Sequence, residues 1–178
     1  MTTADPASRP ASRPASILVR AAVPGDAAAI REVATAAWRS TYAGLIGDET
    51  IERFIATAYT IERVATRIDR HVVLVAGAGE GPVEAFAETR TQDDHVQVVA
   101  IYAHPDARGR GLGSALLERV IAEHPDQDIA ADVLVGNALA EPFYVARGFQ
   151  PGELLTDEIA GEEIIECRWW LRAVLREG

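Results

Sequence analysis

The chain has 178 residues, with 27 acidic side chains against 17 basic ones and a formal net charge of −10. It has one cysteine and no lysine, which excludes Schiff-base and pyridoxal-phosphate enzymes, lysine-dependent phosphate loops, disulfides within the chain and multi-cysteine metal sites. The acidic balance argues against general nucleic-acid binding, and no apolar run approaches the roughly 20 residues of a membrane span.

Residues 1–16 form a low-complexity segment of Pro, Ala, Ser and Arg, which we interpret as a flexible tail. Residues 17–178 have the length of a single domain, and 48% hydrophobic residues can supply its core. We expect a cytoplasmic protein, because the chain lacks the apolar segment of a signal peptide and a disulfide framework.

The first part of the domain predicts one strand, at Ile17–Arg20, and then three helices. Apolar residues recur with helical spacing in three segments, each of which follows a residue that can cap a helix. The three capping residues are Asp26, Asp48 and Thr60. Trp38 continues the apolar face of the first helix, so we expect it in the core.

The pattern then changes to that of strands. Strands are predicted at His71–Ala76, Val83–Glu88 and His95–Ala103, and the short turns between them favour antiparallel pairing. The remaining predicted elements are a helix at Ser114–Glu123, a strand at Ile129–Val135, a helix at Ala138–Arg147 ended by Gly148, and a strand at Ile164–Leu171. This order indicates a mixed α/β fold of the α+β kind, with an antiparallel first half.

The segment with the most functional features is a glycine loop between a predicted strand and a predicted helix. Its sequence is Arg108-Gly109-Arg110-Gly111-Leu112-Gly113-Ser114. Loop N–H groups, the helix dipole and two arginines favour a bound diphosphate. One alternative is a glycine-rich turn without a ligand. Another is a dinucleotide-binding loop, which the G-x-G-x-G spacing and the antiparallel strands before it argue against.

This loop resembles the [Q/R]-x-x-G-x-[G/A] acetyl-CoA signature of the GNAT superfamily of N-acetyltransferases. The segment from Asn137 through Ala140 and Tyr144 to Gly148-Phe149 is similar to that family's N-x-x-A-x-x-x-Y-x-x-x-G-F pattern. The resemblance covers about residues 17–171. It implies the GNAT fold, a mostly antiparallel twisted sheet flanked by helices, with a V-like splay between strands four and five.

The resemblance also implies how acetyl-CoA would bind. The strand edge at Ile101, Tyr102 and Ala103 would pair with the pantetheine arm, and a backbone N–H near Ala103 would polarise the thioester carbonyl. Gly109 to Ser114 would hold the diphosphate, and Asn137 would hydrogen-bond the arm.

Tyr144 would be the general acid that protonates the leaving thiolate; the alternative is an ordinary core tyrosine. The attacking amine needs a proton acceptor, for which Glu84, Glu88, His95 and Gln97 are candidates. Solvated residues on a strand face are the alternative for each of them, and no base is assigned.

The acceptor side is indicated by Trp38-Arg39-Ser40-Thr41-Tyr42-Ala43-Gly44-Leu45, which resembles the W-R-x-T-Y-x-G-L segment of a GNAT branch. In that family the region borders the acceptor cleft. Arg39, Thr41 and Tyr42 are therefore expected on the cleft wall, with Glu84 as a further substrate contact.

The resulting hypothesis is an acetyl-CoA-dependent N-acetyltransferase that acetylates a primary amine of a small molecule by direct attack in a ternary complex. The alternatives are a protein or peptide N-acetyltransferase of the same fold and a non-catalytic acyl-CoA sensor. The four histidines lack metal-ligand spacing, so no metal is predicted. We expect neither nucleic-acid nor membrane partners. Such domains often pair through C-terminal strands or helices, which favours a homodimer.

Overall fold

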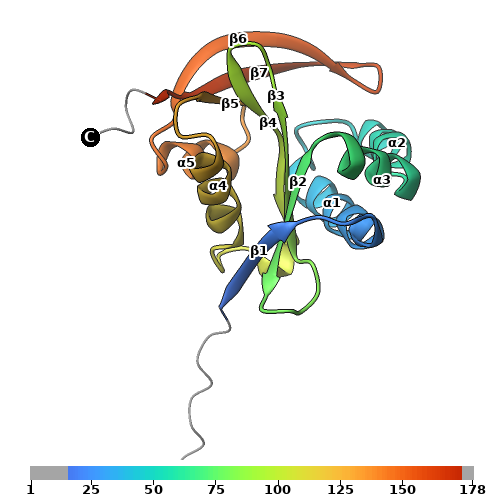
Figure 1. Ribbon diagram of the computed structural model, residues 1–178. Helices are drawn as coiled ribbons and strands as arrows, with labels where there is room; N and C mark the ends of the chain where they lie inside the picture. Colours follow the sequence, from blue (N-terminus) through green and yellow to red (C-terminus); the bar gives the residue numbers. More distant parts are fainter. Residues whose placement is uncertain (1–15, 174–178) are drawn as a thin grey trace, which may run out of the picture.

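A seven-stranded sheet organises the computed structural model, which describes residues 16–173 (Figure 1). Its strands are β1 (Ile17–Ala21), β2 (Val72–Ala78), β3 (Ala85–Thr91), β4 (His95–Ala103), β5 (Asp128–Leu134), β6 (Gln150–Ile159) and β7 (Glu162–Leu171). The helices are α1 (Ala27–Thr41), α2 (Asp48–Ala58), α3 (Ile61–Arg70), α4 (Leu112–Glu123) and α5 (Ala140–Val145), with short 3₁₀ helices at Pro24–Asp26 and Pro105–Ala107. The predicted tail lies, apart from Ser16, outside the described residues.

The strand order across the sheet is β1-β2-β3-β4-β5-β7-β6, and every neighbouring pair is antiparallel except β4 and β5. The parallel pairing of β4 with β5 covers only His95–Val98 and Asp128–Ala131. Beyond those residues β5 continues along β7, whereas β4 continues along β3. The V-like splay implied by the GNAT resemblance is therefore confirmed.

A β-bulge marks the place where the splay begins. Thr89 of β3 faces Val98 and Glu88 faces Ala100, so Val99 is an extra residue in β4. A bulge bends its strand and increases its twist. It therefore helps to carry the second half of β4 away from β5.

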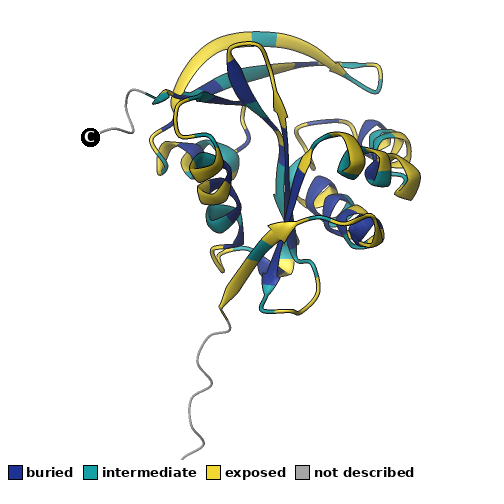
Figure 2. Cartoon of the chain, in the orientation of Figure 1, coloured by how far each residue is buried: buried dark blue, intermediate teal, exposed yellow. Residues whose placement is uncertain are grey.

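Two apolar cores lie on opposite faces of the sheet. The helices α1, α2 and α3 cover one face, where Trp38 and Phe86 are buried, and α4 and α5 cover the other, where Leu116 and Trp169 are buried (Figures 1 and 2). Burying such side chains is worth about 1.5–3 kcal/mol each. The core position predicted for Trp38 is confirmed. No helix among residues 16–173 is long and apolar enough to cross a membrane.

Of the three residues predicted to cap helices, only Thr60 does so with its side chain. Thr60 caps α3, since its hydroxyl accepts the N–H of Arg63 at 3.2 Å. Asp26 precedes α1 without capping it; its carboxylate accepts the N–H of Val23 at 2.8 Å instead. Asp48 is the first residue of α2 rather than its cap.

The strand β6 is absent from the predicted elements. It lies at the edge of the sheet, mostly exposed, and pairs antiparallel with β7, with an irregular register between Pro151 and Leu154. An exposed edge strand with a proline, a glycine and several acidic residues lacks the alternating apolar pattern that identifies strands.

Candidate active site

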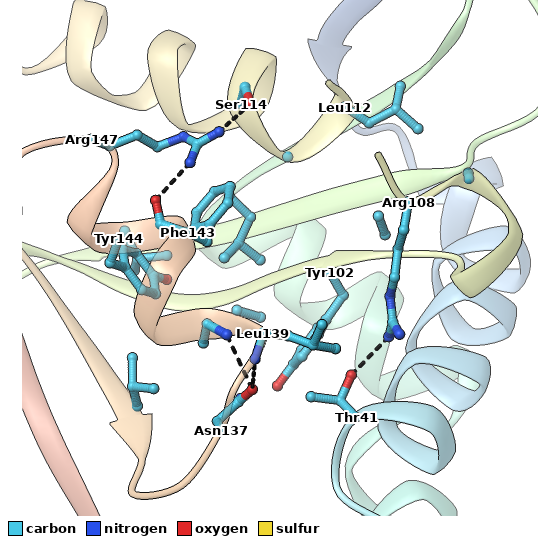
Figure 3. Close-up of a pocket in the computed structure, with 18 of the residues that line it drawn as sticks. Thr41, Tyr102, Arg108, Leu112, Ser114, Asn137, Leu139, Phe143, Tyr144 and Arg147 are labelled. Atoms are coloured by element: carbon cyan, nitrogen blue, oxygen red, sulfur yellow. Dashed lines mark hydrogen bonds between the residues drawn. The ribbon is translucent and has the colours of Figure 1, made fainter. Parts of the chain in front are cut away.

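A cleft of about 440 Å³ lies where β4 and β5 separate (Figure 3). Residues of β4, the glycine loop, the first turns of α4, the segment through α5 and the end of α1 line it. The predicted site residues found in its lining are Thr41, Tyr42, Ile101, Tyr102, Ala103, Arg108, Gly109, Gly111, Leu112, Gly113, Ser114, Asn137 and Tyr144. The fold thus brings together segments that lie more than 100 residues apart in the chain.

The glycine loop reaches α4 through two residues in the left-handed backbone region. Gly109 has φ +73° and Gly111, the residue before α4, has φ +86°. Gly113 packs closely for a different reason, because a Cβ there would lie 3.3 Å from the ring of Phe143, which would have to shift by a few tenths of an ångström. The first turn of α4 contains no acidic residue, so its N–H groups and dipole suit a diphosphate.

The strand β4 presents a backbone edge to the cleft. From Ala100 to Ala103 it pairs with β3 on one side, and after Val98 no strand of the described chain pairs with it on the other. Backbone donors and acceptors on such an edge can pair with the amides of an extended ligand. The pantetheine arm of CoA contains amides and fits this edge.

Asn137 orients the segment that carries Tyr144. Its Oδ1 accepts the N–H groups of Leu139 and Ala140 at 3.2 and 3.1 Å, immediately before α5 (Figure 3). Asn137 lines the cleft, and its side-chain oxygen holds the backbone at the start of α5. A ligand contact from Asn137 stays a prediction, and its visible contribution is to position α5.

Tyr144 lies between the cleft and the core. It is only 5% exposed, and its ring packs edge-on against Phe143 and Phe149 with centroids 5.2 and 5.0 Å away. Its hydroxyl forms no hydrogen bond with another residue of 16–173. Burial raises the pKa of Tyr144 above its usual range, which keeps the phenol protonated and able to donate.

Two arginines line the cleft. Arg108 donates to the hydroxyls of Ser40 and Thr41 at 2.9 and 2.8 Å, which connects the glycine loop to α1. Arg147, which sequence reasoning did not single out, follows α5 and donates to Ser114 of α4. Its place between Tyr144 and Gly148, two motif positions, is the signal that could have identified it.

Three predicted site residues do not line the cleft. Arg110 is held by Glu84, with the closest N···O distance 2.6 Å, and neither residue is in the cleft lining. Arg39 forms an exposed ion pair with Glu52 of α2, also at 2.6 Å. In both cases the arginine forms an ion pair with a glutamate of another segment, outside the cleft lining.

The candidate proton acceptors from the strands also lie outside the cleft lining. Glu88 is 2% exposed and is clamped between Arg67 and Arg90, each 3.1 Å away, so its interpretation as a solvated residue is wrong. His95 is buried and lies 3.2 Å from Gln97. Glu84 is occupied by Arg110.

Carboxylates do lie near the cleft, in the other half of the sheet. Asp132 of β5 lines the cleft and is paired with Arg168 at 2.7 Å. Glu166 of β7 is half-buried, and its carboxylate makes no hydrogen bond or ion pair with another described residue. Burial, and then the charges of Asp132 and Asp157, raise the pKa of Glu166 to about 7.

Known proteins share this architecture. Residues 69–151 match the model of the acetyltransferase (GNAT) domain. The chain is 24% identical over 143 residues to the spermidine N(1)-acetyltransferase of Thermoplasma acidophilum, a match that covers 76% of this chain and 89% of that protein.

Two solved structures have the same fold. An N-acetyltransferase from Thermoplasma acidophilum in complex with coenzyme A superposes with a TM-score of 0.76 at 23% identity, over 88% of this chain and 99% of that chain. A GCN5-related N-acetyltransferase from Rhodopseudomonas palustris gives a TM-score of 0.72 at 25% identity, over 87% and 94% of the two chains.

Proposed function

We propose that this chain, an acetyl-CoA-dependent N-acetyltransferase of the GNAT superfamily, acetylates a primary amine of a small molecule by direct attack in a ternary complex. The observation that carries the proposal is the separation of β4 from β5 after Val98. This separation opens a cleft that is lined by the edge of β4, the N-terminus of α4 and Tyr144.

The donor would lie along β4 with its diphosphate at the glycine loop. Backbone groups between Val99 and Ala103 would pair with the amides of the pantetheine arm. The N–H groups from Gly109 to Ser114 would bind the diphosphate, helped by the helix dipole. This orientation directs the thioester toward the interior of the splay, where Tyr144 lines the cleft.

The reaction requires no covalent intermediate with the protein. The amine nitrogen attacks the thioester carbon, and the negative charge on the carbonyl oxygen is stabilised by a backbone N–H near Ala103. As the C–S bond breaks, the sulfur receives a proton from the Tyr144 hydroxyl. The extra proton of the nitrogen passes to solvent water, from which the Tyr144 phenolate regains a proton. A thiolate whose conjugate acid has a pKa of about 8.5 is a reasonable leaving group.

The charges on the other side of the cleft support a cationic acceptor. A primary ammonium with a pKa near about 10.4 needs a proton acceptor before it can attack. Asp132 lines the cleft, and Glu166 lies close enough to it that, after burial, the Asp132 charge helps raise the pKa of Glu166 to about 7, so Glu166 would accept a proton near neutral pH. The relative named a spermidine N(1)-acetyltransferase also supports an amine of this class.

The test is release of CoA thiol from acetyl-CoA in the presence of different amines. We expect release with small diamines and polyamines and very little without an acceptor. Release only with peptides bearing a free N-terminus would favour the peptide-modifying alternative. Binding of acetyl-CoA without release across the whole panel would favour the sensor. Tyr144→Phe serves as the variant with an impaired chemical step.

A further inference from the structure

We propose that Arg147 binds the 3′-phosphate on the adenosine ribose of CoA and makes the protein selective for CoA over 3′-dephospho-CoA. The inference rests on the proposed function, since it requires that the cleft binds CoA. It adds a specificity-determining residue outside the glycine loop.

Arg147 is anchored at the rim between α4 and α5. It donates to the backbone oxygen of Phe143 at 2.6 Å and to the hydroxyl of Ser114 (Figure 3). Its guanidinium carbon lies 3.8 Å from the centroid of the Phe143 ring. These contacts use two of the five N–H groups of the guanidinium and leave the others available.

The charge distribution singles out Arg147 among the cations near the cleft. Arg110 is neutralised by Glu84, and Arg108 is engaged by two hydroxyls of α1. No carboxylate of residues 16–173 lies within ion-pair distance of the Arg147 guanidinium. A half-buried arginine without an anionic partner, in a protein with a net charge of −10, is suited to an anionic ligand.

The 3′-phosphate is the part of CoA that matches this position. The N–H groups from Gly109 to Gly113 already provide for the diphosphate, and the pantetheine arm follows β4 in the other direction. The adenosine must therefore continue from the loop past the first turn of α4, where Ser114 and Arg147 lie. A planar guanidinium can form paired hydrogen bonds with phosphate oxygens.

The experiment compares the binding of CoA and 3′-dephospho-CoA by isothermal titration calorimetry. We expect Arg147→Gln to weaken CoA binding by about tenfold or more, the size of a charge-assisted hydrogen bond. Binding of 3′-dephospho-CoA should be the same in the variant and the wild type. The wild type should prefer CoA by the factor that the variant loses.

Arg119→Gln is the matched control. It also removes one arginine charge, but Arg119 lies in α4 and is already paired with Glu123. It should leave both affinities unchanged. Equal weakening of both ligands by Arg147→Gln, or no weakening of either, would overturn the inference while leaving the proposed function intact. A wild-type protein that binds neither ligand would overturn the proposed function, and the inference with it.

Discussion

The hydroxyls of Tyr42 and Tyr102 lie 3.0 Å apart and join the end of α1 to β4. Both rings pack near Trp38, with centroids 4.4 and 6.3 Å from it. Burial raises the pKa of Tyr42 to about 12, so this hydroxyl stays protonated at neutral pH. This contact therefore links the end of α1, which is expected to border the amine acceptor, to β4, which is expected to bind acetyl-CoA.

Removing either hydroxyl of this pair should destabilise the protein, because the remaining hydroxyl loses its partner in a partly buried position. We expect Tyr42→Phe to lower the free energy of unfolding by about 1 kcal/mol. Tyr102→Phe and the double variant complete a double-mutant cycle, measured by urea denaturation. Additive effects of the two substitutions would show that the contact does not couple the two elements.

Tyr144→Phe should lower kcat by about 100-fold to 10,000-fold, the range for loss of a general acid. The affinity for acetyl-CoA should change little, since the ring keeps its packing against Phe143 and Phe149. Steady-state kinetics together with calorimetric binding of CoA separate these two effects. Unchanged turnover would remove Tyr144 from the mechanism.

The pKa of Glu166 predicts a pH dependence of stability. The folded state holds this proton up to about pH 7, whereas the ordinary pKa is 4.5. The stabilisation is thus complete below the unfolded pKa and is lost as pH rises through the folded pKa. The neighbouring charges are those of Asp132, Asp157 and Arg168, and Tyr42 also lies within electrostatic range.

Glu166→Gln should therefore become more stable relative to the wild type as the pH rises from 5 to 8. After allowance for solvent screening, we expect a change of about 1 kcal/mol. Chemical denaturation at several pH values measures it. Glu163→Gln, which alters an exposed glutamate of the same strand, is the control. Parallel pH profiles for wild type and Glu166→Gln would contradict the prediction.

Gly111→Ala should destabilise the loop by about 1–2 kcal/mol, because φ +86° is unfavourable for a residue with a Cβ. The new methyl group would also lie 3.4 Å from Cδ1 of Ile17. Thermal or urea unfolding measures the loss. Gly25→Ala provides the comparison, since a methyl group on Gly25 would meet no atom within 4 Å beyond its chain neighbours and the φ of Gly25 is not positive. Equal stability of the two variants would argue against backbone strain at Gly111.

Local sequence patterns predict the helices, most strands and the glycine loop, because those patterns record which side chains face the core. The loop and Tyr144 could be assigned to one cleft through the resemblance to a known family. The bulge at Val99 and the edge strand β6 could not be predicted, because both depend on pairing with another strand.

The sequence also does not predict which charged side chains pair with one another in the folded protein. Glu84 and Arg110 are 26 residues apart, and only the folded sheet shows that they neutralise each other. The same holds for Glu88, whose burial depends on Arg67 from α3. The guanidinium of Arg147, which bonds to Phe143 and Ser114 but has no carboxylate of residues 16–173 within ion-pair distance, is likewise evident only from the folded structure.

The short contact between β4 and β5 divides the sheet into two antiparallel parts that meet along four register pairs. A donor laid along β4 would extend this seam and hold the two parts together. A ligand that binds only the native state stabilises it by mass action, in proportion to its concentration over its dissociation constant. Acetyl-CoA would then increase the free energy of unfolding of the whole sheet, in addition to serving as the acetyl donor.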